Sequence, residues 1–103
     1  CLQRLRGMFA FAIWDHRRRT LFVARDRLGK KPLFYHHDEH GLAFASEPKA
    51  FLRDPSFRAE PDGEALAAYL TYQYVPSPGS AFKGVRKLPP AHYLLVEDGR
   101  LRV

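Results

Sequence analysis

Residues 4–32 read RLRGMFAFAIWDHRRRTLFVARDRLGKKP, and residues 8–14 within them are apolar at every position. A strand with one face in water alternates apolar and polar residues. This uninterrupted run therefore predicts a strand in the middle of a sheet, with both of its faces covered. A helix is the alternative, because Met and Ala are good helix formers. The short length, the aromatic content and the turn that follows favour the strand.

A second strand is expected at residues 20–25, which gives an antiparallel hairpin, and a loop follows it. In that loop Gly29 permits a positive φ, and Pro32 fixes the entry into the next strand. Arg25 and Asp26 adjoin a buried strand end, where charged groups have to satisfy one another. We expect them to form an ion pair that holds the loop, and a catalytic carboxylate at Asp26 is the alternative.

The rest of the chain predicts short strands in hairpins and a few helices. Further strands are expected at residues 33–35, 42–45, 92–96 and 101–103, with an extended segment at 82–90 and an Asp-Gly hairpin turn at 98–99. Leu2 and Leu5 predict the end of a helix that stops at Gly7.

Two further helices are also expected, a short one after residue 46 that ends near residues 54–55 and one over residues 63–72. Ser46 is the expected N-cap of the first, Glu47 suits its positive end, and Pro48 is tolerated in its first turn. Asp62 is the expected cap of the second. Its apolar face, and the aromatic rings at and just after its end, are expected to pack in the core: Leu66, Tyr69, Leu70, Tyr72 and Tyr74. A strand covered on both faces needs a layer on each side, so we expect an α+β layered fold with two or three helices.

Composition sets the class of protein. The chain has 103 residues, 46% of them hydrophobic and 27% charged, which suits one domain or part of one. No apolar run approaches the roughly 20 residues of a membrane span, and no secretory signal is visible. A single cysteine suits a reducing cytoplasm. The chain does not begin with Met, so we expect a piece of a longer protein.

Two features resemble reactive sites. An N-terminal cysteine can act as a nucleophile with its own α-amino group as base, but the polar, helix-like segment after Cys1 favours a structural cysteine. His36, His37 and His40, together with Asp38 and Glu39, resemble a set of metal ligands. Neighbours on a strand point to opposite faces, so the rings of His36 and His37 should not converge, and we expect no metal site.

Several separated motifs resemble the class II glutamine amidotransferase domain. They are RLRGMFAFAIWD at residues 4–15, ARDRLGKKPLFY at 24–35 and ASEPKA at 45–50. Three later motifs are similar to the glutamine-hydrolysing asparagine synthetase branch of that family: YVPSP at 74–78, GVRKLPP at 84–90 and HYL at 92–94. The motifs cover nearly the whole chain in the family's order, and their number and spacing make the resemblance specific.

The resemblance implies an N-terminal-nucleophile hydrolase fold, in which two antiparallel sheets are stacked between helix layers (αββα). It places residues 1–103 in the second half of the glutaminase domain, so the first half and the ATP-dependent synthetase domain are expected outside the sequence. In the family, an N-terminal Cys attacks the glutamine amide, an Asn-Gly pair stabilises the oxyanion, and an Arg and an Asp hold the substrate. Nothing in this chain matches those residues. Cys1 is followed by Leu2 rather than Gly, and we assign no catalytic residue.

The resemblance further implies that the parent protein releases ammonia from glutamine and uses it to amidate ATP-activated aspartate. ATP and Mg are expected in the synthetase domain of the same chain, and no cofactor or metal is expected in this segment. A homodimer is compatible with the resemblance, whereas a membrane partner is not expected. Arg25, Asp26 and Gly29 are expected to hold the loop between the second and third strands, and Ser46 and Glu47 to fix a helix start.

Two alternatives stay open. A related class II amidotransferase could pass ammonia to another acceptor, such as a sugar or a cell-wall-linked carboxylate, because acceptor choice lies in the synthetase domain. The net charge of +6 and the 14% of aromatic residues suggest a basic module that binds nucleic acid. Its cations are scattered and form no known binding module, so this alternative is not favoured.

Overall fold

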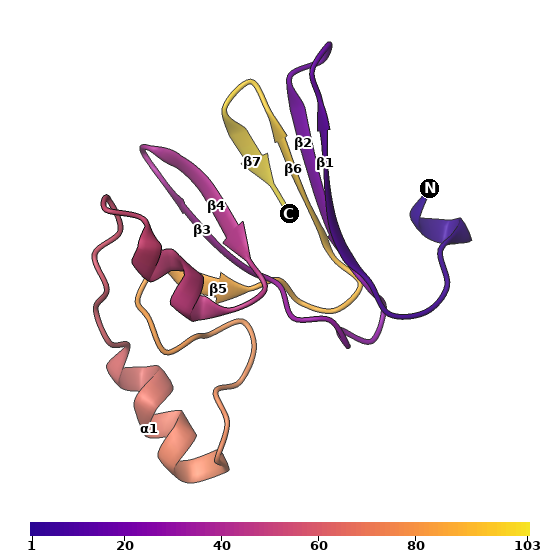
Figure 1. Cartoon of the computed structure of the whole chain (residues 1–103). Helices are drawn as coiled ribbons and strands as arrows, with labels where there is room; N and C mark the ends of the chain where they lie inside the picture. Colours follow the sequence, from indigo (N-terminus) through magenta and orange to yellow (C-terminus); the bar gives the residue numbers. More distant parts are fainter. The chain divides into compact units, whose positions relative to one another are not determined.

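The structure is a computed structural model that describes all of residues 1–103. Its elements, in chain order, are η1 (Leu2–Arg4), β1 (Ala10–Asp15), β2 (Thr20–Arg25), β3 (Phe34–Asp38), β4 (Gly41–Ala45), η2 (Pro48–Arg53), α1 (Gly63–Tyr72), β5 (Val85–Lys87), β6 (Tyr93–Glu97) and β7 (Arg100–Arg102) (Figure 1). The chain forms two compact units. Unit 1 consists of Cys1–Pro32 and Pro89–Val103, and unit 2 of Leu33–Leu88.

Unit 1 contains a four-stranded antiparallel sheet in the order β1-β2-β6-β7. β2 and β6 lie side by side although unit 2 separates them in the sequence (Figure 1). The β1–β2 turn is held by the Asp15 carboxylate, which accepts hydrogen bonds from the backbone N–H groups of Arg17 and Arg18 at 2.9 and 3.0 Å. Asp98 and Gly99 join β6 to β7 with φ values of 50° and 74°, the paired positive φ of the predicted Asp-Gly turn.

Both faces of this sheet are apolar. Val23 and Leu94 are paired in register and fully buried on one face. On the other face, aromatic rings form a row across the strands, with ring centroids 5.4–6.0 Å apart. The row consists of Phe9, Phe11, Phe22 and Tyr93. Such tilted ring pairs add to the stabilisation that comes from burial alone.

β1 departs from our prediction. The strand at residues 8–14 exists, but it lies at the edge of the sheet, and β2 and β6 occupy the middle. Ile13 and Trp14, which point to opposite faces, stay 51% and 56% exposed. The prediction of a central strand with both faces covered is therefore wrong for this structure. An apolar run shows what a strand can bury, whereas the layers packed against it decide what it does bury, and the one helix of unit 1 is the three-residue η1.

Unit 2 contains a three-stranded antiparallel sheet in the order β4-β3-β5. Its most buried apolar side chains come from η2, α1, β5 and the residues just before β3 and just after β5. They are Leu33, Phe51, Ala65, Val85 and Leu88. η2 packs against β4, and its Phe51 ring lies 5.8 Å from that of Phe57, which in turn meets Phe82 at 6.3 Å. These three rings form the aromatic cluster of unit 2.

The helix starts differ from the sequence expectation at two places. The segment after residue 46 is a 3-10 helix whose N-cap is Glu47, not Ser46, and no side chain caps it. Pro48 explains the shift, because a residue before proline is driven to extended backbone, and Glu47 has φ −134° and ψ 139°. At the N-terminus, η1 ends at Arg4, with Leu5 as its C-cap, rather than at Gly7.

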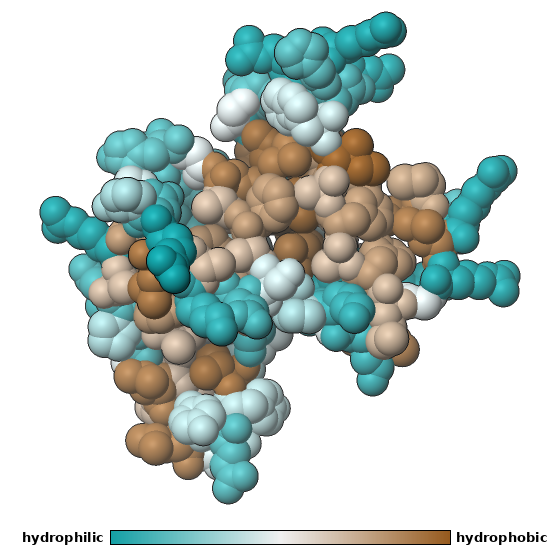
Figure 2. All heavy atoms as spheres, in the orientation of Figure 1, coloured by the Kyte–Doolittle hydropathy of each residue, from teal (hydrophilic) through white to brown (hydrophobic).

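α1 begins as predicted but does not bury its large residues. The Asp62 carboxylate accepts a hydrogen bond from the Ala65 N–H at 3.1 Å, which confirms the predicted cap. Ala65 is the one buried residue of the helix. The side chains expected in the core are exposed instead, namely Leu66, Tyr69, Leu70, Tyr72 and Tyr74, so that prediction is wrong. Figure 2 shows apolar residues at the visible surface over α1 and over the sheet of unit 1.

The α+β class with antiparallel hairpins and few helices is confirmed. Two antiparallel sheets and short helices are consistent with a piece of an N-terminal-nucleophile hydrolase domain. No helix of the chain combines the length and apolarity needed to cross a bilayer.

We predict that Leu94→Ala destabilises the chain by roughly 3 kcal/mol, because it leaves a cavity beside Val23 in the centre of the sheet. The measurement is the free energy of unfolding from urea titration. Leu70→Ala is the matched control, since Leu70 is 83% exposed, and its effect should stay within about 0.5 kcal/mol. Equal losses in the two variants would contradict the assignment of the core.

Candidate functional site

The most densely bonded polar group of unit 1 is the carboxylate of Asp26, in the loop after β2. Its residue is 1% exposed. One oxygen, Oδ1, accepts hydrogen bonds from the N–H groups of Leu28 and Lys30 at 3.1 and 2.9 Å. The other, Oδ2, accepts from the N–H groups of Lys31 and Phe9 at 3.0 and 3.3 Å. Four backbone donors thus surround one buried carboxylate.

The backbone of Asp26 extends the same network. Its N–H donates to the Phe9 carbonyl at 2.9 Å, and its carbonyl accepts from Gly29 and Ala91 at 3.1 and 3.0 Å. Asp26 therefore ties three segments of unit 1 together: the start of β1, its own loop, and the segment that leads into β6. We call this arrangement the Asp26 knot.

The side chain of Arg25 wraps the outside of the loop. Its Nε donates to the Lys31 carbonyl at 2.8 Å, and its Nη2 donates to the Gly29 carbonyl at 2.7 Å. Charge-assisted bonds of this kind are stronger than neutral ones. We predicted that Arg25 and Asp26 hold the loop as an ion pair. The bonds described here run from each side chain to the backbone of the loop.

Gly29 sits where only glycine fits. Its φ is +65°, and a Cβ built on it would lie 2.7 Å from Cγ of Pro90 and 3.1 Å from Cζ of Arg25. The positive φ disfavours other residues, and the close approach of Pro90 leaves no room for a side chain.

The environment of Asp26 determines its chemistry. The hydrogen bond from the Lys31 N–H lowers the pKa of Asp26 most, and those from Lys30, Phe9 and Leu28 lower it further against the opposing effect of burial, to about 2. A carboxylate held this strongly in its charged form and shielded from water is a poor general base. The geometry thus gives Asp26 the means to hold a loop and does not favour the catalytic alternative.

An open depression of about 660 Å³ borders the knot. Its lining combines the exposed apolar side chains of Met8 and Leu28 with the cations Arg6, Arg27 and Lys30. Leu28 and Lys30 extend from the loop whose backbone N–H groups bond to Asp26. Nothing in this lining is arranged as a nucleophile with its base.

The other residues singled out from the sequence lie apart from the knot. Glu47 in unit 2 forms an exposed ion pair with Lys49 at 2.9 Å, and Ser46 provides no cap. Cys1 is exposed. No three or more His, Cys, Asp or Glu side chains gather so as to hold a metal ion.

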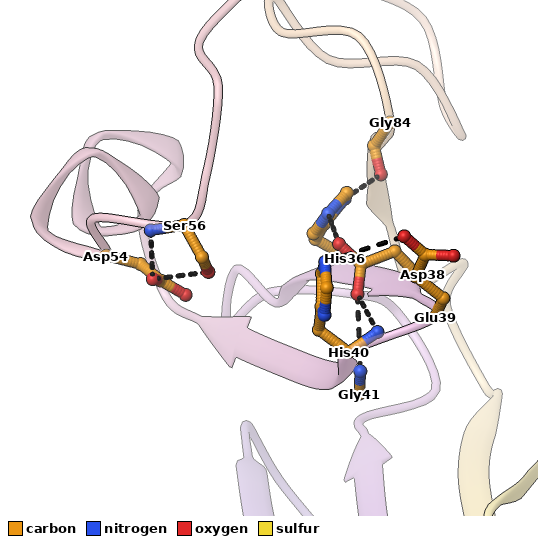
Figure 3. A network of polar contacts seen from close by, with 8 residues as sticks. All are labelled: His36, Asp38, Glu39, His40, Gly41, Asp54, Ser56 and Gly84. Carbon is orange, nitrogen blue, oxygen red and sulfur yellow. Dashed lines mark hydrogen bonds and ion pairs between the residues drawn. The ribbon is translucent and has the colours of Figure 1, made fainter.

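Sequence reasoning missed the role of His36. The two ring nitrogens of His36 lie within hydrogen-bond distance of the Asp38 carboxylate and of the carbonyl oxygen of Gly84 (Figure 3). Gly84 is 48 residues away in the sequence. The strand periodicity that separates His36 from His37 was the available signal, but it could not show that the Gly84 loop comes to lie against one of them.

Comparison with known proteins gives a consistent picture. The family model described as "Glutamine amidotransferase domain" matches residues 1–103. The chain is 40% identical over 104 residues to "Asparagine synthetase [glutamine-hydrolyzing] 3" of Bacillus subtilis (strain 168), covering 100% of the chain and 17% of that protein. It is 51% identical over 103 residues to "Putative asparagine synthetase [glutamine-hydrolyzing]" of Mycobacterium tuberculosis (strain ATCC 25618 / H37Rv), covering 97% of the chain and 16% of that protein.

A relative with a different name is also similar. "Amidase chry2" of Gibberella zeae is 37% identical over 94 residues, covering 91% of the chain and 13% of that protein. The chain therefore spans about a sixth or less of the length of the curated relatives it matches.

We predict that the Asp26 knot makes stability depend on pH in the acid range. The pKa of Asp26 is about 2 in the folded chain against 3.8 for an ordinary aspartate. A carboxyl whose pKa is lowered by folding contributes stability above its unfolded pKa and loses that contribution as pH falls through its folded pKa. The free energy of unfolding should therefore fall steeply from about pH 4 to about pH 2.

Asp26→Asn tests the assignment, because an amide N–H₂ placed against backbone N–H donors cannot accept their hydrogen bonds. The variant should be much less stable at neutral pH and should show a weaker dependence on acid than the wild-type chain. Asp98→Asn, in an exposed turn, is the matched control and should leave both properties unchanged. An Asp26→Asn chain as stable as wild type at neutral pH would show that the knot is not needed.

Proposed function

Because this chain belongs to the glutamine amidotransferase domain family, we propose that its parent protein hydrolyses glutamine to glutamate and ammonia. We propose further that the parent uses this ammonia for ATP-dependent amidation of aspartate to asparagine. The observation that carries the proposal is the family match over residues 1–103 together with relatives named glutamine-hydrolysing asparagine synthetases.

In this proposal residues 1–103 are scaffold. The carboxylate of Asp26 is occupied by hydrogen bonds from backbone N–H groups. The residues that follow Cys1 do not resemble those that follow the family's nucleophile, because Leu2 stands in place of Gly. The knot fixes the geometry of the loop after β2, and the rest of the glutaminase domain supplies the chemistry. The chain by itself is then inactive towards glutamine.

ATP and Mg belong to the synthetase domain in this proposal, and the residues present here do not fit them. The sequence has no Ser-Gly-Gly-x-Asp-Ser loop for a pyrophosphate, and no side-chain cluster in the structure could hold a metal ion. The partners proposed for the parent are glutamine, aspartate and the synthetase domain of the same chain. The single cysteine supports a cytoplasmic location.

An acceptor of ammonia other than aspartate is the second candidate, and one specific observation favours it. The similarity to the protein named "Amidase chry2" indicates that the same type of domain occurs in proteins with names other than asparagine synthetase. A related amidotransferase that delivers ammonia to another carboxylate or to a sugar would contain the same fold in this segment.

We predict that the 103-residue chain releases no ammonia from glutamine above the buffer rate, because it contains no oxyanion or substrate-binding residues of the family. The measurement is a coupled glutamate assay at saturating glutamine. Cys1→Ala should give the same result as the wild-type chain. Robust hydrolysis that disappears in Cys1→Ala would make Cys1 a nucleophile and overturn the scaffold role.

The acceptor is tested in the parent protein, supplied with glutamine, ATP and Mg. With aspartate present, the proposal expects asparagine, AMP and pyrophosphate in equal amounts. Glutamine hydrolysis without asparagine formation, combined with amidation of a different acceptor, would support the second candidate and reject the first.

A further inference from the structure

The strand β1 presents an unprotected sheet edge. The two sheets of the chain have four edge strands, β1 and β7 in unit 1 and β4 and β5 in unit 2 (Figure 1). Exposed backbone N–H and C=O groups on an edge attract further strands, so proteins protect edges with short strands, charged side chains, proline or a covering element. The other three edges have such protection, and β1 does not.

The protected edges differ from β1 in length, charge or cover. β5 and β7 are three residues long, and each contains two basic residues. β4 is in contact with η2. In contrast, β1 runs over six residues, its side chains are apolar from Ala10 to Trp14, and its pairing with β2 is continuous, without a bulge.

Hydrogen bonds at the start of β1 show which of its backbone groups face the open edge. The Asp26 N–H donates to the Phe9 carbonyl at 2.9 Å, so these two residues form a hydrogen-bonded pair. Such pairs alternate along two antiparallel strands. Phe11 and Ile13 therefore turn their N–H and C=O groups towards β2. The groups of the intervening residues point away from β2, and these residues are Ala10, Ala12 and Trp14.

The hydrogen bonds on the other side of β2 support this assignment. The Arg25 N–H donates to the His92 carbonyl at 3.1 Å, on the side of β6. Arg25 is paired with Ala10, so the backbone groups of β2 face away from β1 at this position. Ala12 and Trp14 are exposed, and no backbone hydrogen bond of a turn or loop involves them. The edge is therefore open to a further strand.

A second copy of the chain fits this edge poorly. Antiparallel pairing of two β1 strands about Ala12 would bring Arg18, in the turn of one copy, towards Arg6 of the other, because both are equally far from Ala12 in the sequence. Like charges that face each other across strands are destabilising. Each copy also has a formal charge of +6, so the two copies repel each other.

A longer parent protein offers an occupant without this repulsion. The chain spans 17% and 16% of two relatives that it matches, and its whole length matches the model of a glutamine amidotransferase domain. Strands from the rest of such a domain belong to the same molecule. Their effective concentration at the edge is therefore high, whereas a second copy has to associate from solution.

We propose that β1 pairs, in the parent protein, with a strand from the part of the glutamine amidotransferase domain that lies outside residues 1–103. The inference rests on the proposed function, because it takes the parent to be a longer amidotransferase. The added strand exchanges hydrogen bonds with the backbone groups of Ala10, Ala12 and Trp14. Its residues beside the two alanines are large and apolar, because small side chains leave space for them on that face.

Amide hydrogen exchange in the parent protein tests the pairing, followed by mass spectrometry with fragmentation to single residues. The amides of Phe11 and Ile13, which face β2, are the internal reference. Those of Ala10, Ala12 and Trp14 should exchange as slowly as this reference, and at least roughly a hundredfold more slowly than in the 103-residue chain. Fast exchange at the three positions beside slow exchange of the reference would overturn the proposal.

Dilution of the parent distinguishes the two occupants. The same exchange is measured over a range of protein concentrations, with the oligomeric state determined by sedimentation. Slow exchange at Ala10, Ala12 and Trp14 should be independent of concentration, because the added strand belongs to the same molecule. Protection that disappears as the parent dissociates would assign the edge to a second copy and reject the added strand.

Ala12→Pro distinguishes a paired edge from one that is only covered. Proline removes the N–H of position 12, which faces the open edge in the 103-residue chain, so the same change in that chain is the matched control. Exchange of the buried Val23 amide reports opening of the sheet. Ala12→Pro should accelerate it at least roughly tenfold more in the parent than in the chain, because only the parent loses a ladder hydrogen bond.

An equal effect of Ala12→Pro in both proteins would show cover without pairing and overturn the proposal. If the variant parent does not fold, the exchange of the wild-type parent decides alone. These results are independent of the proposed function. A parent that makes no asparagine but protects the three amides refutes the function and retains the added strand, whereas an active parent with fast exchange at these positions does the reverse.

Discussion

A buried carboxylate surrounded by backbone N–H groups is the constraint on which unit 1 depends. Asp26 accepts from four amides and joins the start of β1, the loop after β2 and the segment before β6. Burying such a charge is costly unless donors compensate for the lost water. Here four backbone N–H groups compensate, three of them from the loop after β2, and they hold that loop in place. The rigid position of Gly29 and the arrangement of Arg25 follow from the same network.

The two units differ in how their apolar side chains are covered. Unit 2 buries apolar side chains around η2 and the cluster of Phe51, Phe57 and Phe82, while the large residues of α1 stay exposed. Unit 1 has a sheet that is apolar on both faces, and its edge strand β1 stays largely exposed. A sheet of this kind suits a layered domain in which further elements cover both faces. That matches a family whose relatives are about six times longer than this chain.

Local sequence signals predicted local structure well and burial poorly. The hairpin turns, the Asp62 cap and the positive φ of Gly29 follow from backbone preferences of single residues, so they were predictable. The place of β1 in the sheet and the exposure of Tyr69 depend on which segments pack together, and no residue pattern in β1 or α1 contains that information. The start of the helix after residue 46 was predictable in principle, because the effect of Pro48 on the backbone of Glu47 is local. The capping preference of serine pointed instead to Ser46.

The candidate site shows the same division. The RDRLGKKP motif indicated that Arg25, Asp26 and Gly29 belong to one loop, yet the sequence suggested that the two charges satisfy each other. The backbone donors that surround Asp26 are invisible in a sequence, because every residue carries an N–H and only the fold decides where it points. The contact of the His36 ring with Gly84 was hidden for a related reason, since Gly84 belongs to a distant segment of the sequence.

The ends of unit 2 meet: the Leu88 N–H donates to the Leu33 carbonyl at 2.9 Å. Unit 2 is an insertion between the two halves of unit 1, so pairing β2 with β6 requires the closure of a long loop. Loop-closure entropy opposes such non-local pairing and slows it. Once unit 2 has folded, its joined ends replace that flexible loop by a short connection, and most of the entropic barrier to completing the four-stranded sheet is removed. During synthesis the first hairpin must wait for unit 2 to emerge and fold before its partner strand arrives, and in that interval its apolar residues are open to aggregation.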